Sequence, residues 1–318
     1  MKDRYGRDIN YMRISVTDRC NLRCVYCMPE KGIVKQEHDS ILRNEEILEI
    51  VAAAGELGIS KIRITGGEPL VRRGIAELCY LISKTPGISE LGITTNGQLL
   101  PLMASELKDA GVTRVNISID TLDAQKYSKI TRGGDLYTTI AGIQAAKSAG
   151  LTPVKLNTVL INGFNDMEIP GFVSMTRHED IEVRFIELMP IGEGIELWEK
   201  SFLPNNAVLD AVPELVPADG ICGGVAKLYR LVNGVGRVGL INPVSSHFCA
   251  QCNKLRLTSD GRLKPCLHSS QEISVRGLQG ENLICAFVDA VNSKPSRHGG
   301  LSTQTPSSAG RHMNRIGG

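Results

Sequence analysis

The sequence is poor in aromatic residues and in net charge. Aromatic side chains make up 4% of the 318 residues, and 36 basic residues against 34 acidic ones leave a formal net charge of +2. Proteins that bind nucleic acid usually combine a strongly basic surface with aromatic side chains that stack on bases. Both features are weak here, so the composition argues against nucleic acid or an anionic membrane surface as a partner.

Long apolar runs are missing as well. No stretch approaches the ~18 residues that a transmembrane helix requires, and a cysteine motif begins at Cys20, too early to follow a cleaved signal peptide. The nine cysteines include two tight groups of three. This usage favours metal ligation in a reducing compartment over a disulfide framework, and it predicts a cytoplasmic protein with no membrane partner.

The first cysteine group lies in CNLRCVYC, where three residues separate Cys20 from Cys24 and two separate Cys24 from Cys27. Iron-sulfur clusters normally take four thiolates, so three in one loop predict a cubane with one iron open to another ligand. A zinc site would need a fourth ligand nearby. The next candidate, His38, has no conventional zinc-knuckle spacing, and the loop is therefore interpreted as a reactive iron-sulfur site.

The second cysteine group lies in FCAQCNKLRLTSDGRLKPC, where Cys249, Cys252 and Cys266 are two and then thirteen residues apart. Taken alone, this spacing is ambiguous. A zinc ribbon with a fourth ligand from His247 or His268 stays open on ligand chemistry.

Strand-like and helix-like segments alternate over residues 10–200. The strand-like runs are 12–16, 61–65, 91–95, 114–119, 154–159 and 183–187, and helix-like stretches include 44–57 and 99–110. Six βα units predict an α/β fold, an incomplete (β/α)6 barrel. We expect a barrel domain of residues 1–224 and a smaller C-terminal domain of residues 225–318, which carries the second cysteine group and shields the barrel mouth from water.

Active sites of such barrels gather where the strands end. Several motif residues directly follow a predicted strand, namely Cys20, Gly66, Gly67, Asn96, Asp120 and Met189. In GGEPL, the two glycines allow a close backbone approach, and Glu68 offers a carboxylate to an ammonium group.

A CxxxCxxC loop after the first strand, with Tyr26 before its last cysteine and GGEP one unit later, resembles the radical S-adenosylmethionine (SAM) superfamily. With the second cysteine group and the terminal RIGG, the whole chain resembles the GTP 3',8-cyclase family, which opens molybdenum cofactor biosynthesis. The resemblance implies two [4Fe-4S] clusters, SAM and a radical reaction. A 5'-deoxyadenosyl radical removes hydrogen from C3' of GTP, and the carbon radical attacks C8 to give 3',8-cyclo-7,8-dihydro-GTP.

The resemblance also implies which residues contact SAM: Tyr26, Gly67, Glu68, Ser118 and Met189. Tyr26 would lie beside the adenine, and Glu68 would hold the amino group. Taken singly, Ser118 and Met189 are more often strand-end structure or core residues.

GTP contacts implied in the same way are Arg13, Arg63, Thr94, Lys155, Lys254, Leu255 and Arg256. The family commonly has Arg where this chain has Lys254, which keeps the charge but loses the bidentate geometry. Leu255 could contribute only its backbone. The open iron of the second cluster would bind the guanine edge, and Gly317 and Gly318 would reach back into the active site as catalytic accessories.

Partners follow from the same resemblance. It implies GTP as substrate, an electron donor, a homodimer, and hand-over of the product to the next enzyme of the pathway, cyclic pyranopterin monophosphate synthase.

Two other functions stay open: a radical SAM peptide-maturing enzyme with an auxiliary cluster, and a non-catalytic zinc-knuckle protein that binds nucleic acid.

Other features are structural. GVGRVG at 234–239 predicts a hairpin, Cys79 and Cys285 predict small core residues, and Cys222 lies in a glycine-rich linker. Residues 294–312 have the composition of a mobile tail.

Overall fold

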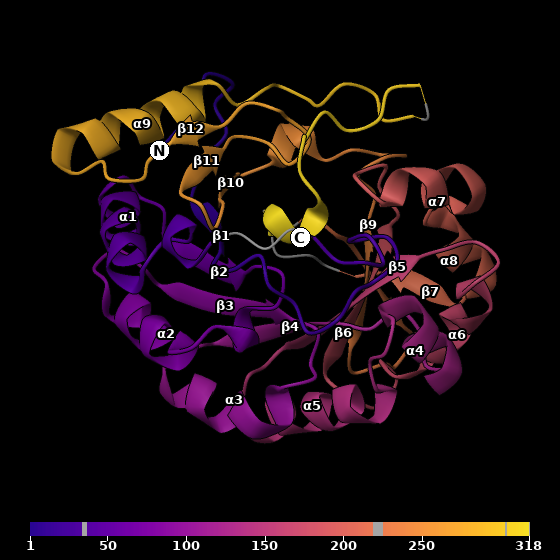
Figure 1. Cartoon of the computed structure of the whole chain (residues 1–318). Helices are drawn as coiled ribbons and strands as arrows, with labels where there is room; N and C mark the ends of the chain where they lie inside the picture. Colours follow the sequence, from indigo (N-terminus) through magenta and orange to yellow (C-terminus); the bar gives the residue numbers. More distant parts are fainter. Residues whose placement is uncertain (34–36, 219–224, 303, 318) are drawn as a thin grey trace.

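Six parallel strands in sequence order form the centre of the molecule, a computed structural model that describes residues 1–33, 37–218, 225–302 and 304–317. They are β1 (Tyr11–Ser15), β2 (Lys61–Thr65), β3 (Glu90–Thr95), β4 (Arg114–Ser118), β5 (Val154–Leu160) and β6 (Ile181–Glu187). Figure 1 shows the sheet curved into an arc with helices on its outer side. The predicted incomplete (β/α)6 barrel is confirmed, with strand ends shifted by one or two residues.

Six helices follow the strands and cover the outer side of the arc (Figure 1). They are α1 (Asn44–Glu56), α2 (Ile75–Lys84), α3 (Leu100–Asp109), α4 (Ala124–Thr131), α5 (Leu136–Ser148) and α6 (Ile169–Ser174). Each strand turns alternate side chains toward this layer. In β1, Met12 and Ile14 are fully buried in the core beneath the helices. Tyr11 and Arg13 therefore face the inner side of the arc.

The remaining strands extend both edges of this sheet. At one edge β6 pairs with β9 (Arg237–Ile241), followed by β8 (Lys227–Leu231) and β7 (Leu215–Pro217). At the other edge β1 pairs in parallel with β10 (Lys254–Leu257), followed by β11 (Arg262–Lys264) and β12 (Ile273–Ser274). Strands from the predicted C-terminal domain thus flank the barrel on both sides.

The predicted boundary between residues 224 and 225 adjoins a segment, 219–224, that lies outside the described residues, and it stays a prediction. Cys222 falls in the same segment. The predicted hairpin is confirmed, because β8 and β9 pair antiparallel around the GVGRVG stretch.

Three further helices complete the chain: α7 (Gly194–Ser201), α8 (Asn206–Ala211) and α9 (Gly280–Asn292). Cys79 is buried in α2, as predicted. The prediction for Cys285 in α9 was wrong, because this cysteine is exposed. The buried face of α9 is formed by Leu283, Ala286, Phe287 and their helical neighbours, and Cys285 lies on the opposite face.

The prediction of a mobile tail over residues 294–312 needs correction. Apart from residue 303, which is not described, the stretch has no helix or strand, but Lys294 and Ala309 are buried, and Arg311 forms ion pairs. A short helical turn, Met313–Arg315, follows and lies inside the arc (Figure 1). Within the described part of the chain, every helix is too short or too polar to span a bilayer.

Candidate functional site

The first cysteine loop leaves the end of β1 and is braced by the helix layer. Backbone N–H groups of Arg23 and Val25 donate to carbonyls at the end of α4, at 3.0 and 2.9 Å. The guanidinium of Arg132, just beyond α4, donates to the carbonyl of Met28 at 2.9 Å. Within the loop, the N–H groups of Cys27 and Met28 both donate to the carbonyl of Cys24. Neighbouring elements thus hold the loop in a defined turn.

The three thiols of this loop lie close enough to influence one another. Burial raises the pKa of Cys20 to about 11 and, with the nearby charge of Cys20, that of Cys27 to about 12. Burial, Cys27 and Asp120 also raise the pKa of Cys24 well above its usual value. Three crowded, buried thiols ionise readily only with a cationic partner. The donor set therefore fits an iron-sulfur cluster.

The GGEP segment after β2 packs directly against the cysteine loop. The N–H of Gly67 donates to the carbonyl of Thr17 at 2.7 Å, and that of Glu68 donates to the carbonyl of Arg19 at 2.8 Å. A Cβ atom at position 67 would lie 2.8 Å from the carbonyl oxygen of Asp18. Glycine is therefore needed at position 67 for contact between the two loops. The sequence indicated a close backbone approach here, but not that the cysteine loop is the neighbour.

The carboxylate of Glu68 is buried and accepts three hydrogen bonds. Its donors are the Thr95 hydroxyl at 2.7 Å, the Asn96 N–H at 2.7 Å and the Leu70 N–H at 3.1 Å. Burial nevertheless raises its pKa to about 7. Glu68 thus joins the ends of β2 and β3 beside the cysteine loop.

Tyr26 and Asp120 connect the first cysteine loop to strands β4 and β5. The Tyr26 hydroxyl donates to Asp120 at 2.6 Å, and the other Asp120 oxygen accepts from the Val159 N–H at 2.8 Å. Burial raises the pKa of Asp120 to about 6. Ser118 lies two residues before Asp120, at the end of β4. Met189, after β6, packs against a small apolar cluster that contains Ile316 from the C-terminal segment.

The second cysteine loop lies next to β10 and β11. Cys249 begins a short helical turn, Cys252 lies two residues before β10, and Cys266 lies two residues after β11. The ammonium of Lys294 is buried and donates to the carbonyls of Lys254 at 2.8 Å and Pro265 at 2.7 Å. Lys294 therefore ties together the segments that carry Cys252 and Cys266.

Arg7 supports the other end of this loop. Its guanidinium pairs with Asp3 at 2.6 Å and donates to the carbonyl of Cys249 at 2.8 Å. Burial would raise the pKa of Cys252, but the charges of Lys294 and Lys254 lower it below its usual value. A positive surrounding favours the thiolate form that a cluster needs.

The histidines considered as zinc ligands make other contacts. His268 lies with a ring nitrogen 3.1 Å from the Ser307 hydroxyl, and His247 packs edge-on against His298. Among residues outside the gaps at 34–36, 219–224, 303 and 318, no three Cys, His, Asp or Glu side chains converge to hold one metal ion. In an iron-sulfur cluster each thiolate binds a separate iron, so neither cysteine group needs to converge in that way.

Basic side chains gather on the inner side of the sheet. Each of them except Lys254, which begins β10, occupies a position between two buried core residues of its strand, which turns it inward. The residues are Arg13 of β1, Arg63 of β2, Lys155 of β5, Arg184 of β6, and Lys254 and Arg256 next to the second cysteine loop. Leu255 is fully buried in the core, so only its backbone is available, as expected.

Arg13 and Lys155 lie close enough to other cations for their pKa values to be lowered. Burial and Arg256 lower the pKa of Arg13 to about 9, and burial and Arg184 lower that of Lys155 to about 8. Burial would raise the pKa of Tyr11, but Arg63 and Arg13 lower it to about 7. The inner side therefore carries crowded positive charge, which a polyanion would stabilise.

Partial neutralisation comes from residues that the sequence interpretation missed. Glu182 pairs with Lys155 at 2.7 Å and with Arg184 at 2.5 Å. The Thr94 hydroxyl and the side-chain amide oxygen of Asn157 are buried without a hydrogen-bond partner within the described residues. Thr94 was predicted to contact GTP, whereas Asn157 and Arg184 were not. Strand alternation would have revealed both, since each lies between two core positions.

Gly92 provides room for one of these cations. A Cβ atom there would lie 2.7 to 3.0 Å from the guanidinium atoms of Arg63. Arg63 uses that space to donate to the Asn116 side chain at 2.9 Å and to the Tyr11 hydroxyl at 3.0 Å. The absence of a side chain at Gly92 thus allows the inward-facing Arg63 to adopt this orientation.

The C-terminal segment enters the same region. Arg256 donates to the carbonyl of Gly317 at 2.6 Å. Gly317 has a φ of +76°, and an added Cβ would collide with the hydroxyl of Thr65. Both its backbone conformation and its surroundings therefore require glycine. Gly318 lies outside the described residues.

The fold is similar to that of known radical SAM proteins. The crystal structure of Streptococcus suis SuiB bound to S-adenosylmethionine aligns with a TM-score of 0.61 at 15% identity. The alignment covers 91% of this chain, which spans 66% of the SuiB chain. At this level of identity the likeness concerns the fold alone.

Family comparisons divide the chain into two parts. Residues 14–175 match the radical SAM superfamily, and residues 181–300 match the family described as Molybdenum Cofactor Synthesis C.

Proteins similar over their full length include the GTP 3',8-cyclase of Alkaliphilus oremlandii (strain OhILAs), 53% identical over 321 residues and covered completely in both chains. The GTP 3',8-cyclase of Peptoclostridium acidaminophilum is 52% identical, with 99% of this chain and 98% of that protein covered. One from Clostridium botulinum (strain Hall / ATCC 3502 / NCTC 13319 / Type A) is 45% identical over 320 residues, with complete coverage of both. Full-length identity at this level, combined with the two family matches, shows that the chain belongs to the GTP 3',8-cyclase family of the radical SAM superfamily.

Proposed function

We propose that this protein converts GTP to (8S)-3',8-cyclo-7,8-dihydroguanosine 5'-triphosphate, the cyclisation that opens molybdenum cofactor biosynthesis. One observation carries the proposal: the cysteine groups lie at opposite ends of the neighbouring parallel strands β1 and β10, beside an inner side crowded with basic residues. Relatives named GTP 3',8-cyclase over the same full length support it. As a radical SAM enzyme, the protein uses SAM and [4Fe-4S] clusters, which when bound supply the one-electron chemistry for hydrogen abstraction.

Cys20, Cys24 and Cys27 would hold the first cluster, and the SAM site would be built around their loop. Tyr26 is oriented by Asp120, so its ring is held at a fixed angle beside the loop. Gly67, Glu68, Ser118 and Met189 complete the SAM set, which lies at the ends of β2, β4 and β6 and in the loops after them. The buried Glu68 would bind the amino group of SAM in addition to its three present donors.

The triphosphate of GTP would lie against the inward-facing cations. Arg13, Arg63, Lys155, Lys254 and Arg256 supply charge, and we add Arg184 because it faces the same side and pairs with the same Glu182. Crowded cations gain most from a polyanionic ligand, since it relieves their mutual repulsion. The unpartnered oxygens of Thr94 and Asn157 and the backbone of Leu255 would bind neutral groups of the nucleotide.

Cys249, Cys252 and Cys266 would hold the second cluster and present it to the guanine edge. Lys294 and Arg7 hold the backbone of this loop from two sides, which fixes where the base would be received.

We propose a domain division at residues 1–224 and 225–318, with the second part shielding the reaction from water. Gly317 and Gly318 would act as catalytic accessories at the inner side of the sheet.

We further propose a cytoplasmic location, a one-electron donor as reductant, a homodimer, and delivery of the product to cyclic pyranopterin monophosphate synthase. The cysteine usage supports a reducing compartment. The product is a reactive intermediate of a longer synthesis, which favours direct transfer.

Anaerobic incubation of the reconstituted protein with SAM, a strong reductant and each nucleoside triphosphate in turn tests the function. We expect a product of the same mass as the substrate, but of different retention, from GTP alone. Equal conversion of ATP, or SAM cleavage with no nucleotide product, would contradict the assignment.

A further inference from the structure

The C-terminal segment is attached to the rest of the molecule at successive points. The Ser307 N–H donates to the carbonyl of Pro190 at 3.0 Å, and the Ser308 hydroxyl donates to the carbonyl of His268 at 2.8 Å. Farther on, Ala309 and Ile316 are buried together with Ile191. The segment therefore crosses from the second cysteine loop toward β6.

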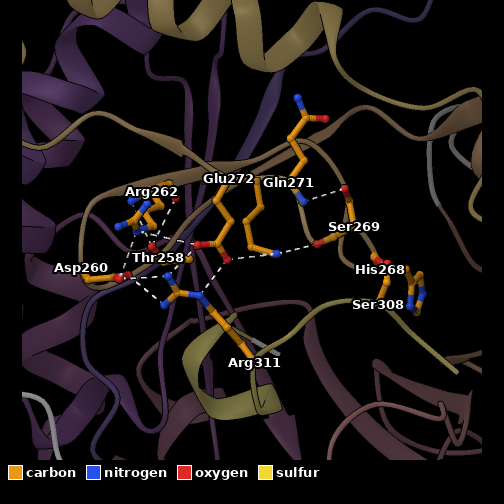
Figure 2. A network of polar contacts seen from close by, with 10 residues as sticks. Thr258, Asp260, Arg262, His268, Ser269, Gln271, Glu272, Ser308 and Arg311 are labelled. Atoms are coloured by element: carbon orange, nitrogen blue, oxygen red, sulfur yellow. Dashed lines mark hydrogen bonds and ion pairs between the residues drawn. The ribbon is translucent and has the colours of Figure 1, made fainter.

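Arg311 makes the most extensive polar contact in this segment. Figure 2 shows its guanidinium between the carboxylates of Asp260 and Glu272. It donates to both Glu272 oxygens at 2.7 and 2.6 Å, and to both Asp260 oxygens at 3.0 and 2.9 Å. The three side chains are only 14 to 19% exposed. Two bidentate pairs fix both the position and the plane of the guanidinium.

The hairpin that anchors Arg311 also receives the end of the chain. Asp260 lies in the turn between β10 and β11, and Arg256 of β10 donates to the carbonyl of Gly317. Between these two points, the Asn314 amide donates to the carbonyl of Asp18 in the first cysteine loop at 2.9 Å. Six residues from Arg311 to Gly317 can span at most about 20 Å. Fixing Arg311 therefore restricts where the terminal residues can go.

We propose that Arg311 is a positioning residue that holds residues 313–317 across the inner side of the sheet, so that Gly317 meets Arg256 and Thr65. The expected effect on cyclisation rests on the proposed function. The anchoring of the segment by Arg311 does not depend on that function. Through Asp260 the anchor belongs to the hairpin beside the second cysteine group, and through Asn314 the segment contacts the loop of the first. Arg311 thereby sets one segment against both cysteine loops.

Hydrogen exchange of the full-length reconstituted protein tests the anchoring. The Arg315 and Ile316 amides donate to the carbonyls of His312 and Met313, so they report on the order of the segment. In Arg311→Ala these amides should exchange about tenfold faster or more, because charge-assisted bonds are lost. Arg311→Lys should be intermediate, since a point charge cannot reproduce four directed bonds. Arg177→Ala, which removes an exposed ion pair with Glu214, should match the wild type.

The positioning role is tested on the same proteins by the ratio of cyclised product to SAM cleaved. We expect that ratio to fall about tenfold or more in Arg311→Ala, while iron content and SAM cleavage persist. An amide exchange rate in Arg311→Ala equal to that of the wild type would overturn the anchor. Faster exchange with an unchanged ratio of cyclised product to SAM cleaved would overturn the positioning role.

Two further outcomes keep the inference decidable. If Arg311→Ala does not fold, Asp260→Asn replaces it as the test variant, because asparagine keeps the shape of the acceptor and removes one charge. Amide exchange at the wild-type rate in Asp260→Asn would then overturn the anchor. A wild-type protein that forms no cyclised nucleotide overturns the proposed function and the positioning role with it. The exchange rates would still judge the anchor by themselves.

Discussion

Six cysteines determine how much iron the protein can hold, and the two groups should fail separately. We expect the wild type to bind about eight irons per chain, in two [4Fe-4S] clusters. Cys24→Ala should bind about four and lose SAM cleavage, whereas Cys252→Ala should bind about four and keep some cleavage without cyclised product. Iron analysis and SAM cleavage assays measure both. Zinc in place of iron in wild-type protein reconstituted anaerobically would contradict this prediction.

Arg13 should contribute to GTP binding without affecting SAM. Replacement by glutamine removes one charge-assisted contact, which should weaken GTP binding by about 1.5 to 3 kcal/mol, or tenfold and more. Equilibrium binding of each ligand to the variant gives the comparison. Arg177→Gln, far from the inner side and exposed, is the control. A matching loss of SAM affinity would show that Arg13 acts on the fold instead of on the triphosphate.

Lys155 should make GTP binding depend on pH. Burial and Arg184 lower its pKa from an ordinary 10.5 to about 8 in the ligand-free protein. A bound triphosphate favours the protonated form and raises that pKa again, so binding takes up a proton and should weaken as the pH rises from 8 to 10. Titration calorimetry in buffers of different ionisation heat measures the uptake. Lys155→Arg has a higher intrinsic pKa and should make the dependence shallower, while Arg13, with a pKa of about 9, still titrates in this range; an equally steep curve would exclude Lys155.

The residue level also shows what sequence reasoning could reach. The cysteines and the glycines of GGEP are readable because their spacing is local. Arg184 and Asn157 were missed although strand alternation places both inward. The pair of Glu182 with Lys155 could not be foreseen, since it joins two strands, whereas Arg184 lies in the same strand as Glu182.

At the scale of elements, a buried lysine holds the second cysteine loop together. Lys294→Met keeps the bulk of the side chain but removes both hydrogen bonds to the backbone around Cys252 and Cys266. We expect the second cluster to be lost selectively, so that iron falls to about half while SAM cleavage continues. Lys200→Met, in α7, is a control on an exposed lysine. Full iron content in Lys294→Met would show that the brace is dispensable.

Elements were predicted well where the pattern was periodic and poorly where it was not. The six strands follow from apolar runs between turns. The helix α9 also follows from its pattern, but its buried face does not, because Cys285 adjoins apolar residues on both sides of the sequence and still points outward. The composition of residues 294–312 suggested mobility, yet a few buried anchors suffice to attach such a segment.

At the scale of the whole molecule, the end of the chain should decide whether radical chemistry leads to cyclisation. A protein that ends at Ile316 lacks the Gly317 carbonyl that Arg256 contacts. We expect it to keep both clusters and GTP binding, yet to lose most of the cyclised product. Iron analysis, GTP binding measurements and product analysis of the truncated protein measure cluster content, GTP binding and cyclisation separately. Gly310→Ala alters a glycine with open surroundings in the same segment, although at positive φ, and should be milder.

A truncated protein that cyclises GTP at the wild-type rate would show that the terminal glycines have no role. The sequence could indicate the glycine pair but not its surroundings. Contacts of Gly317 with Thr65 and Arg256 arise only after strands from opposite ends of the chain have paired.

That pairing has a consequence for how the protein is made. Tyr11 of β1 lies beside Lys254 of β10, and Asn10 and Asn253, 243 positions apart, are hydrogen-bonded. A ribosome adding 5 to 20 residues per second needs about 12 to 50 s to cover that distance. Throughout this interval the nascent chain presents an open strand edge next to the first cysteine loop, and such edges readily pair with other chains. The newborn protein is therefore most vulnerable to aggregation, and its first three thiols most open to oxidation, until β10 has been synthesised.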